Sequence, residues 1–239
     1  MKALYPILSA TCGVLVSVRA LLLTAALALG LAAPAQAQAP ATMDPIKPCY
    51  VSDGDLPSQR ETIHVHAAGF TPNEALTLLI DGVEVSHGMS DAFGEVRAEI
   101  PAPFQGEGER LFTIGVLEDL NKEHLATQTS RVTNLGVTLR PKRARPSRRI
   151  RFVGRGFTND APVYGHYLFG GKVRRTVRFA RRPTLPCGVF RAKRKQIPVK
   201  RPATGDWLLQ VDQQRRYAAL PASNAQRVII KVTETFKKP

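Results

Sequence analysis

The five histidines are the first candidates for chemistry in this sequence. His64 and His66 stand two residues apart, so on a strand they would share one face, a spacing that a metal ion accepts. No cysteine or second histidine pair lies near them in the sequence, and a closed site needs more ligands. We therefore interpret both as exposed imidazoles and predict no metal site.

Two groups of carboxylates could also do chemistry. Asp53 and Asp55 in "SDGD" carry oxygen ligands that calcium prefers, but the further ligand spacing is missing, so a solvated loop is favoured. Asp212 in "QVDQQRRY" follows an apolar segment, where it could pair with Arg215 or Arg216 in a structural role. No pair of carboxylates near a histidine suggests acid–base catalysis.

Established catalytic motifs are missing. The sequence has no G-x-S-x-G, H-E-x-x-H, Walker loop or C-x-x-C. We predict no catalytic residue and no cofactor. A hydrolase assembled from residues distant in sequence stays open as a third hypothesis.

The charge of the chain is divided between its halves. The net charge is +15, yet residues 43–139 hold 6 Lys and Arg against 15 Asp and Glu, a net −9. Residues 140–239 hold 26 Lys and Arg against 4 Asp and Glu, a net +22. Such a charge repels itself, so a counter-charge is expected nearby.

Three basic runs carry this charge, at 140–151, 174–182 and 191–201. We expect them to bind an anionic polymer or an acidic protein, with affinity that falls steeply with salt. Two alternatives stay open: the acidic half neutralises them within the chain, or they are solvated faces. The candidate binding residues are Arg143, Arg145, Arg148, Arg149, Arg151, Arg174, Arg175, Arg178, Arg181, Arg182, Lys193, Arg194 and Lys195.

The elements that must position these residues have a period of two. Apolar residues alternate with others at 63–67, 76–80, 96–100, 111–116, 150–152, 163–169, 207–211 and 228–232. This is the pattern of half-buried strands, and Gly, Pro, Asn and Asp between them are turn residues. Many short strands separated by turns predict an antiparallel sandwich.

An internal repeat divides the strands into two sets. "IHVHAAGFTPN" (63–73) returns as "IRFVGRGFTND" (150–160), and three further blocks follow in the same order. The offset grows from 87 to 94 residues between the first two blocks, which places an insertion of seven within residues 172–188. Gly69 and Gly156 suit a sharp bend with positive φ, and the following phenylalanines are expected to plug the end of the sandwich. A phosphate loop is excluded because no helix follows.

The motifs "GFTPNEALTLLIDGVEV" and "SDAFGEVRAEIPAP" resemble a bacterial immunoglobulin-like repeat of the IPT/TIG type. The segment "VYGHYLFGGKVRRTV…CGVF…GDWLLQVDQQRRY" resembles the second domain of small secreted bacterial proteins built from two such modules. The resemblance covers about residues 45–236. It implies the fold and leaves activity undetermined, since these domains serve as adhesins, spacers and wall proteins.

The beginning of the chain predicts export. Lys2 and Arg19 precede an apolar run that ends in two A-x-A sites, as in a signal peptide cleaved after Ala37 or Ala39. An uncleaved membrane anchor is the rival, and lipidation of Cys12 is less favoured. Cys49 and Cys187 would remain, either bridged or as two separate packed thiols.

The sequence thus predicts an all-β protein of two tandem immunoglobulin-like antiparallel β-sandwiches after a cleaved N-terminal signal peptide. The expected parts are a signal peptide (1–39), an acidic domain (43–139), a basic linker (140–149) and a basic domain (150–239). We expect a non-enzymatic, secreted or extracytoplasmic binding module of the cell envelope, without a transmembrane span after cleavage. The alternative is a structural spacer or stabilising subunit with the two domains docked on each other.

Overall fold

The computed structural model describes residues 40–221 and 224–233. The predicted signal peptide, 1–39, and its cleavage sites lie outside the described residues. Within the described ranges the chain is all-β, apart from one short 3-10 turn, η1 (Pro57–Gln59). None of the helical segments found there is long and apolar enough to cross a membrane.

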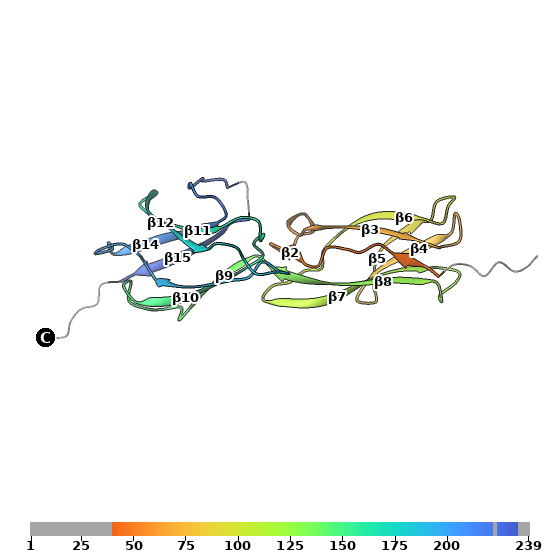
Figure 1. Cartoon of the computed structure of the whole chain (residues 1–239), viewed down its shortest axis with the longest axis horizontal. Helices are drawn as coiled ribbons and strands as arrows, with labels where there is room; N and C mark the ends of the chain where they lie inside the picture. The colour runs from red at the N-terminus through yellow and green to blue at the C-terminus, as the bar shows by residue number, and fades with distance from the viewer. Residues whose placement is uncertain (1–39, 222–223, 234–239) are drawn as a thin grey trace, which may run out of the picture. The chain divides into compact units, whose positions relative to one another are not determined.

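The first copy of the repeat folds into two facing sheets (Figure 1). One sheet has the order β1-β3-β6, and the other has the order β2-β8-β7-β4-β5. All pairs are antiparallel except β2 with β8, which is parallel. The strands are β1 (Thr42–Met43), β2 (Tyr50–Ser52), β3 (Thr62–Ala68), β4 (Ala75–Ile80), β5 (Val83–Met89), β6 (Val96–Pro101), β7 (Glu109–Glu118) and β8 (Leu125–Asn134).

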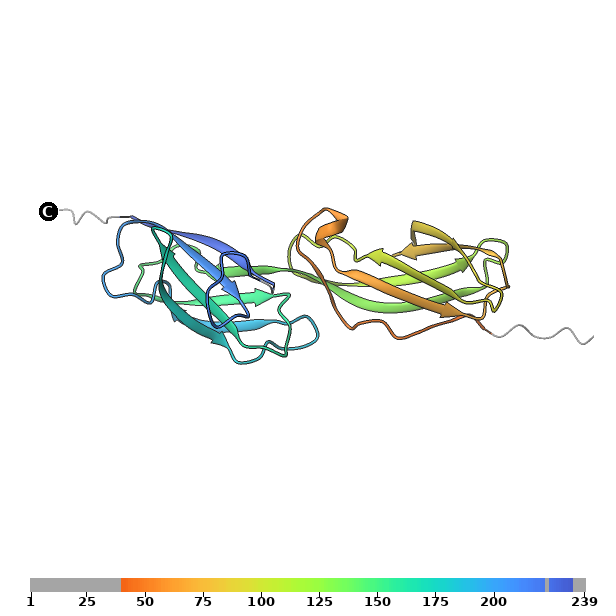
Figure 2. The same ribbon diagram turned by 90° about the horizontal axis from the view of Figure 1, so that it is seen from above.

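Among the described residues the second copy repeats this topology without a counterpart of β2, and both copies are seen from above in Figure 2. Its sheets have the orders β9-β10-β13 and β12-β11-β14-β15, with every pair antiparallel. The prediction of immunoglobulin-like sandwiches is therefore confirmed. The strands are β9 (Gly136–Arg140), β10 (Arg149–Arg155), β11 (Val163–Phe169), β12 (Lys172–Ala180), β13 (Phe190–Lys195), β14 (Gly205–Asp212) and β15 (Gln226–Val232).

Each sandwich buries its own core along the predicted alternation. In the first copy Ile63, Leu76 and Ile114 are fully buried, and on β3 the neighbours of Ile63, Thr62 and His64, are exposed. In the second copy Phe152, Leu209 and Val211 are fully buried, but Gln210 and Asp212, the neighbours of Val211 on β14, are also 0% exposed. Side chains alternate between the faces of a strand, so β3 buries one set and exposes the other, whereas the C-terminal half of β14 is buried on both faces.

The Gly-Phe motif marks the same corner in both copies. Gly69 has a φ of 92° and Gly156 a φ of 79°, and Phe70 and Phe157 are each only 3% exposed. The amide of Phe70 donates to the carbonyl of Gly94 (3.1 Å), as that of Phe157 does to Gly188 (3.3 Å). The corner is therefore a structural device, as predicted.

The threonine of the motif is held by a side chain from the far end of a neighbouring strand. The amide and hydroxyl of Thr71 donate to the Glu118 carboxylate at 3.2 and 2.7 Å. In the second copy Thr158 donates in the same way to the side-chain oxygen of Gln213, at 2.9 and 3.1 Å. A buried carboxylate and an amide thus serve one structural role in the two copies.

The border between the copies differs from the sequence interpretation, which placed residues 43–139 in the first domain and 140–149 in a linker. β9 pairs with β10, with Leu139 opposite Phe152, so these residues belong to the second sandwich. Residues 141–148 then connect two strands of a single sheet. Their Pro and Arg content suits an exposed hairpin loop as well as a linker, so composition could not separate the two.

Substitution of Gly188 tests the tight corner. A Cβ at Gly188 would lie 1.4 Å from the carbonyl oxygen of Phe157, whereas at Gly170 it would meet nothing within 4 Å. The φ angles are 60° and 58°, so both alanine variants lose about 1 kcal/mol from backbone strain. We expect Gly188→Ala to lose about 1–3 kcal/mol more through steric overlap. Urea unfolding monitored by Trp207, the one tryptophan, measures the difference. Equal losses of stability in the two alanine variants would contradict the close approach of Gly188 to the Phe157 carbonyl.

Glu118 should make the first sandwich sensitive to acid. Burial raises the pKa of Glu118, but hydrogen bonds from Thr71 and His124 outweigh burial and hold it below its usual 4.5. A carboxyl group whose pKa is lower in the folded than in the unfolded protein stabilises the fold at pH values above its unfolded pKa. This stabilisation is lost as the pH falls through the folded-state pKa. Glu118→Gln should therefore flatten the dependence of stability on pH below about 4.5, followed by circular dichroism in urea. Glu123→Gln, at an exposed position, is the control and should leave the dependence unchanged.

Candidate anion-binding face of the second sandwich

The outer face of sheet β9-β10-β13 gathers six cations. Ile150 and Phe152 are 2% and 0% exposed in the core, which turns Arg149 and Arg151 of the same strand outward. Arg149 lies opposite Lys195, and Arg151 lies between Lys193 and Arg140. We call this set the basic face: Arg140, Arg149, Arg151, Arg191, Lys193 and Lys195.

The basic face is a regular array of like charges. Neighbouring strands lie about 4.8 Å apart, and residues two apart on a strand lie about 6.7 Å apart. Like charges directly opposite each other destabilise a sheet. The arrangement therefore weakens the free fold and favours any ligand that brings several negative charges to the face.

The described basic half offers no carboxylate to balance these charges. The ion pairs of Lys or Arg found in the described chain all lie in the first copy: Lys47–Glu61, Arg97–Glu95, Arg110–Asp81, Lys122–Asp119 and Arg131–Glu109. Between residues 140 and 233, leaving aside 222–223, no Lys or Arg has a carboxylate oxygen within 4.0 Å. Composition explains this, since residues 140–239 hold 26 Lys and Arg but only 4 Asp and Glu.

The thirteen predicted binding residues form more than one group. Arg149, Arg151, Lys193 and Lys195 share the basic face. Arg143, Arg145 and Arg148 lie in the loop before β10. Arg174, Arg175 and Arg178 lie on β12, at the edge of the other sheet, and Arg181 and Arg182 follow that strand.

One of the predicted binding residues does not lie on the basic face, and two residues of the basic face were not predicted. Arg194 pairs with the buried Ile150 and donates instead to the carbonyls of Lys193 (3.0 Å) and Arg178 (3.5 Å). Arg140 and Arg191 were not among the candidates, although both lie on the basic face. The period of two along residues 191, 193 and 195 is the signal that could have found Arg191.

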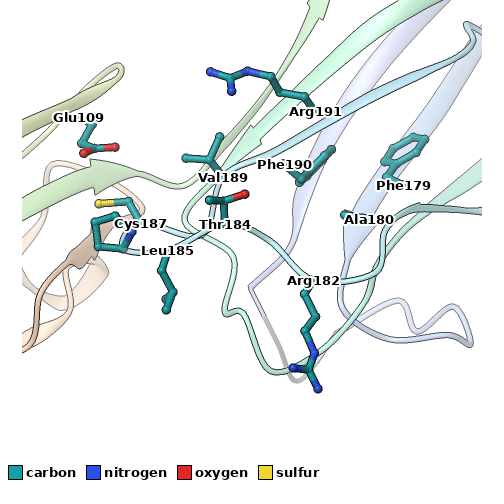
Figure 3. Close-up of a pocket in the computed structure, with 11 residues that line it drawn as sticks. Glu109, Phe179, Ala180, Arg182, Thr184, Leu185, Cys187, Val189, Phe190 and Arg191 are labelled. Carbon is teal, nitrogen blue, oxygen red and sulfur yellow. The ribbon is translucent and has the colours of Figure 1, made fainter.

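A hollow of about 460 Å³ lies beside β13 and is lined by two of the arginines already named. Arg182 and Arg191 line it, but their side chains point away from one another (Figure 3). Phe179 and Phe190 form part of the wall and belong to the core. The hollow therefore does not direct its cations at one ligand, unlike the open basic face.

A buried polar cluster lies in the other sheet of the second sandwich. His166 and Asp212 are 0% exposed, and His166 Nε2 lies 3.2 Å from Asp212 Oδ1 and 3.0 Å from the carbonyl oxygen of Gln214. Because both neighbours of Nε2 are acceptors, the proton of neutral His166 lies on Nε2. Nδ1 then accepts from the Thr176 hydroxyl at 3.0 Å.

This acid–histidine–hydroxyl order is that of nucleophilic catalysis, yet its hydrogen bonds are already satisfied. Gln210 donates to Asp212 Oδ2 (2.8 Å), and the amide of Gln214 donates to Oδ1 (2.9 Å). Burial raises the pKa of Asp212, but hydrogen bonds from His166 and Gln210 outweigh burial and lower it. The cluster fixes the chain after β14 over the sheet. Asp212 thus pairs with His166, where the sequence pointed to Arg215 or Arg216.

His64 and His66 share one strand face, as expected, and each meets acidic side chains. His64 Nδ1 lies 3.1 Å from Glu99. His66 contacts Asp44 at 2.7 Å and Glu95 at 3.3 Å, and these hydrogen bonds raise the pKa of His66. In the described chain no group of three or more His, Cys, Asp or Glu is placed to hold a metal ion.

Cys49 and Cys187 form a disulfide, one of the two possibilities left open by the sequence. Their Cα atoms lie 5.3 Å apart and their separation in sequence is 138 residues. Cys187 lies in a loop closed by hydrogen bonds between Thr184 and Val189 (2.7 and 2.9 Å). The bridge joins the first copy covalently to the inserted segment of the second.

Comparisons with known proteins leave the family open. No protein-family model and no curated protein sequence matches the chain. Solved structures that resemble it include a Parabacteroides merdae β-glucuronidase (11% identity, TM-score 0.27), the human OSCAR ligand-binding domain (9%, 0.30) and a bacterial ice-binding adhesin (13%, 0.28). In the same order, the matches cover 81%, 82% and 82% of this chain. The chain in turn spans 24%, 99% and 65% of the length of those structures. TM-scores this low carry no argument about function.

Neutralising one cation of the basic face should stabilise the fold. Arg151 lies between Arg140 and Lys193, so Arg151→Gln removes two like-charge contacts. We expect the free energy of unfolding to rise by about 0.5 kcal/mol at low salt and the gain to fade at high salt. Urea unfolding monitored by Trp207 measures it. Arg215→Gln, an exposed position off the basic face, is the control. A loss of stability at low salt for Arg151→Gln would contradict the repulsion.

Proposed function

We propose that this protein is a non-enzymatic, exported binding module whose basic face holds an anionic polymer of the cell envelope. The observation that carries the proposal is the basic face, six cations in register without a carboxylate partner in the described chain. Four of the six are arginines, whose planar guanidinium groups bind phosphate or carboxylate oxygens through two hydrogen bonds.

Two further features support an extracytoplasmic setting. The Cys49–Cys187 disulfide is of a kind that persists in oxidising compartments and is rare in the cytosol. The sequence also begins with the pattern of a signal peptide. Both fit a ligand met outside the cytoplasm.

The structural alternative, in which the acidic and basic halves neutralise each other, has less support. The disulfide and a hydrogen bond from Gln226 to Asp53 (3.0 Å) join the copies. No ion pair between described residues does so, although the halves carry −9 and +22. The charge of the basic half therefore stays available to a ligand.

Binding of inorganic polyphosphate to the full-length chain tests the proposal, with neutral dextran as the blank ligand. The variant Arg149→Gln/Arg151→Gln/Lys193→Gln should weaken binding strongly and lower the slope of log affinity against log salt by about three. The matched control is Arg174→Gln/Arg175→Gln/Arg178→Gln on β12, which removes the same charge from the other sheet.

The control triple should keep the wild-type slope. If both triple variants lost the same polyphosphate affinity, net charge alone would attract the polymer, and a dedicated binding face would be refuted. Dextran binding comparable to polyphosphate would refute the electrostatic basis.

A further inference from the structure

The two copies differ by one strand. In the first copy β2 lies parallel to β8 at the edge of the larger sheet, with Tyr50 opposite Val132. The strand of the second copy that corresponds to β8 is β15, since β14 and β7 occupy equivalent places next to them. Among the described residues β15 pairs with β14 on one side and with no strand on the other. In the described part of the chain, no strand of the second copy takes the place that β2 has in the first.

A shorter connection explains the missing strand. In the first copy the chain runs from β1 to β3 through residues 44–61, which include β2. The corresponding connection in the second copy, from β9 to β10, is only residues 141–148. Eight residues rich in Arg and Pro make a hairpin loop but cannot also cross to the other sheet.

A groove of about 780 Å³ lies where the strand is missing. Val137 and Leu139 of β9 form one wall and Val228 and Ile230 of β15 the other. The volume is within the range of about 300–1,000 Å³ that is usual for binding sites. β15 also presents Ile229, which is 63% exposed. In Figure 2 β15 is the violet-blue strand that leads to the C-terminal trace.

The chemistry of the groove selects the ligand. An unpaired strand edge offers a row of amide and carbonyl groups to another extended chain. Lys142, Arg143 and Lys231 stand at the rim, and Glu107 is the one acid among the lining residues. The ligand should therefore be extended, apolar on its inward side and acidic on its outward side.

We propose that the groove beside β15 binds an extended acidic peptide of a partner protein, which adds as a parallel strand in the place that β2 occupies in the first copy. β2 shows what such a strand looks like: Tyr50 and Ser52 are 4% and 2% exposed, with Val51 between them half-buried. When a peptide adds as a strand, main-chain hydrogen bonds provide the affinity and every second side chain provides the specificity. This site is separate from the basic face.

A second copy of this chain is a poor occupant of the groove. Pairing of two β15 edges would bring Arg227 and Lys231 of both copies together in a half that already carries +22. Charged residues on an edge strand discourage this contact between copies. An acidic chain meets no such repulsion.

The test uses the full-length chain and a fluorescein-labelled heptapeptide of alternating Glu and Val, capped at both ends. Its control is the same peptide with every backbone nitrogen methylated, which keeps the charge and side chains but removes the N–H donors of both strand edges. Anisotropy should show binding of the control weakened at least about tenfold. Hydrogen exchange at the amides of 226–232 should slow only with the unmodified peptide.

Two variants separate this site from the basic face. Arg149→Gln/Arg151→Gln/Lys193→Gln should keep peptide binding even if polyphosphate binding is lost. In the second variant, residues 141–148 are replaced by a copy of residues 44–61 in which the cysteine is changed to serine, while the native Cys49 is kept. This copy gives the second sandwich its own edge strand and should abolish peptide binding. Native Trp207 fluorescence reports whether this variant has folded.

Several outcomes would overturn the proposal. Equal affinity for both peptides, slower exchange in β10 or β13 instead of β15, or no binding up to about 1 mM would each do so. A folded variant with residues 44–61 that still binds the peptide would do so as well. The wild-type peptide comparison keeps the proposal testable if that variant does not fold.

Discussion

Burial of Ile150, Phe152 and Ala192 in the second core determines where the cations of the basic half can lie. A strand has a period of two, and a shift by one residue would turn its buried set outward. The core therefore fixes the register of β10 against β13, and that register places Arg149 and Arg151 opposite Lys195 and Lys193. The basic face is a consequence of packing on the opposite side of the same strands.

Repulsion on this face has to be offset elsewhere in the second sandwich. The aromatic rings of Phe152, Phe179 and Phe190 stack in the core, with centroids 4.8 and 5.9 Å apart for the pairs that share Phe179. The disulfide closes a loop long enough to contribute on the order of 4–5 kcal/mol in the chain-entropy model. Stability of this kind allows a surface to keep charges that weaken the free fold, as binding surfaces commonly do.

The sequence predicted the fold better than the site because alternation and turn residues are local signals. The Gly-Phe corner, the buried sets of β3 and β10 and the offset from 87 to 94 all follow from short patterns. The boundary at 139 was wrong since Gly136–Arg140 pair with a strand across a hairpin, a contact that composition does not encode. Arg194 was grouped with its neighbours for the same reason: charge runs do not show which face of a strand a residue occupies. The pairing of His166 with Asp212 depends on strands 46 residues apart and had no local signal.

The difference between the copies is most informative at the connection after their first strand. Shortening it to residues 141–148 removes the strand that covers β8 in the first copy and exposes the edge of β15. The same loop brings Lys142 and Arg143 to the rim of the groove. One change in loop length thus opens a backbone edge and sets the charge around it, while the core beneath keeps its pattern. In a duplicated sandwich a new surface can arise in this way without any new element of fold.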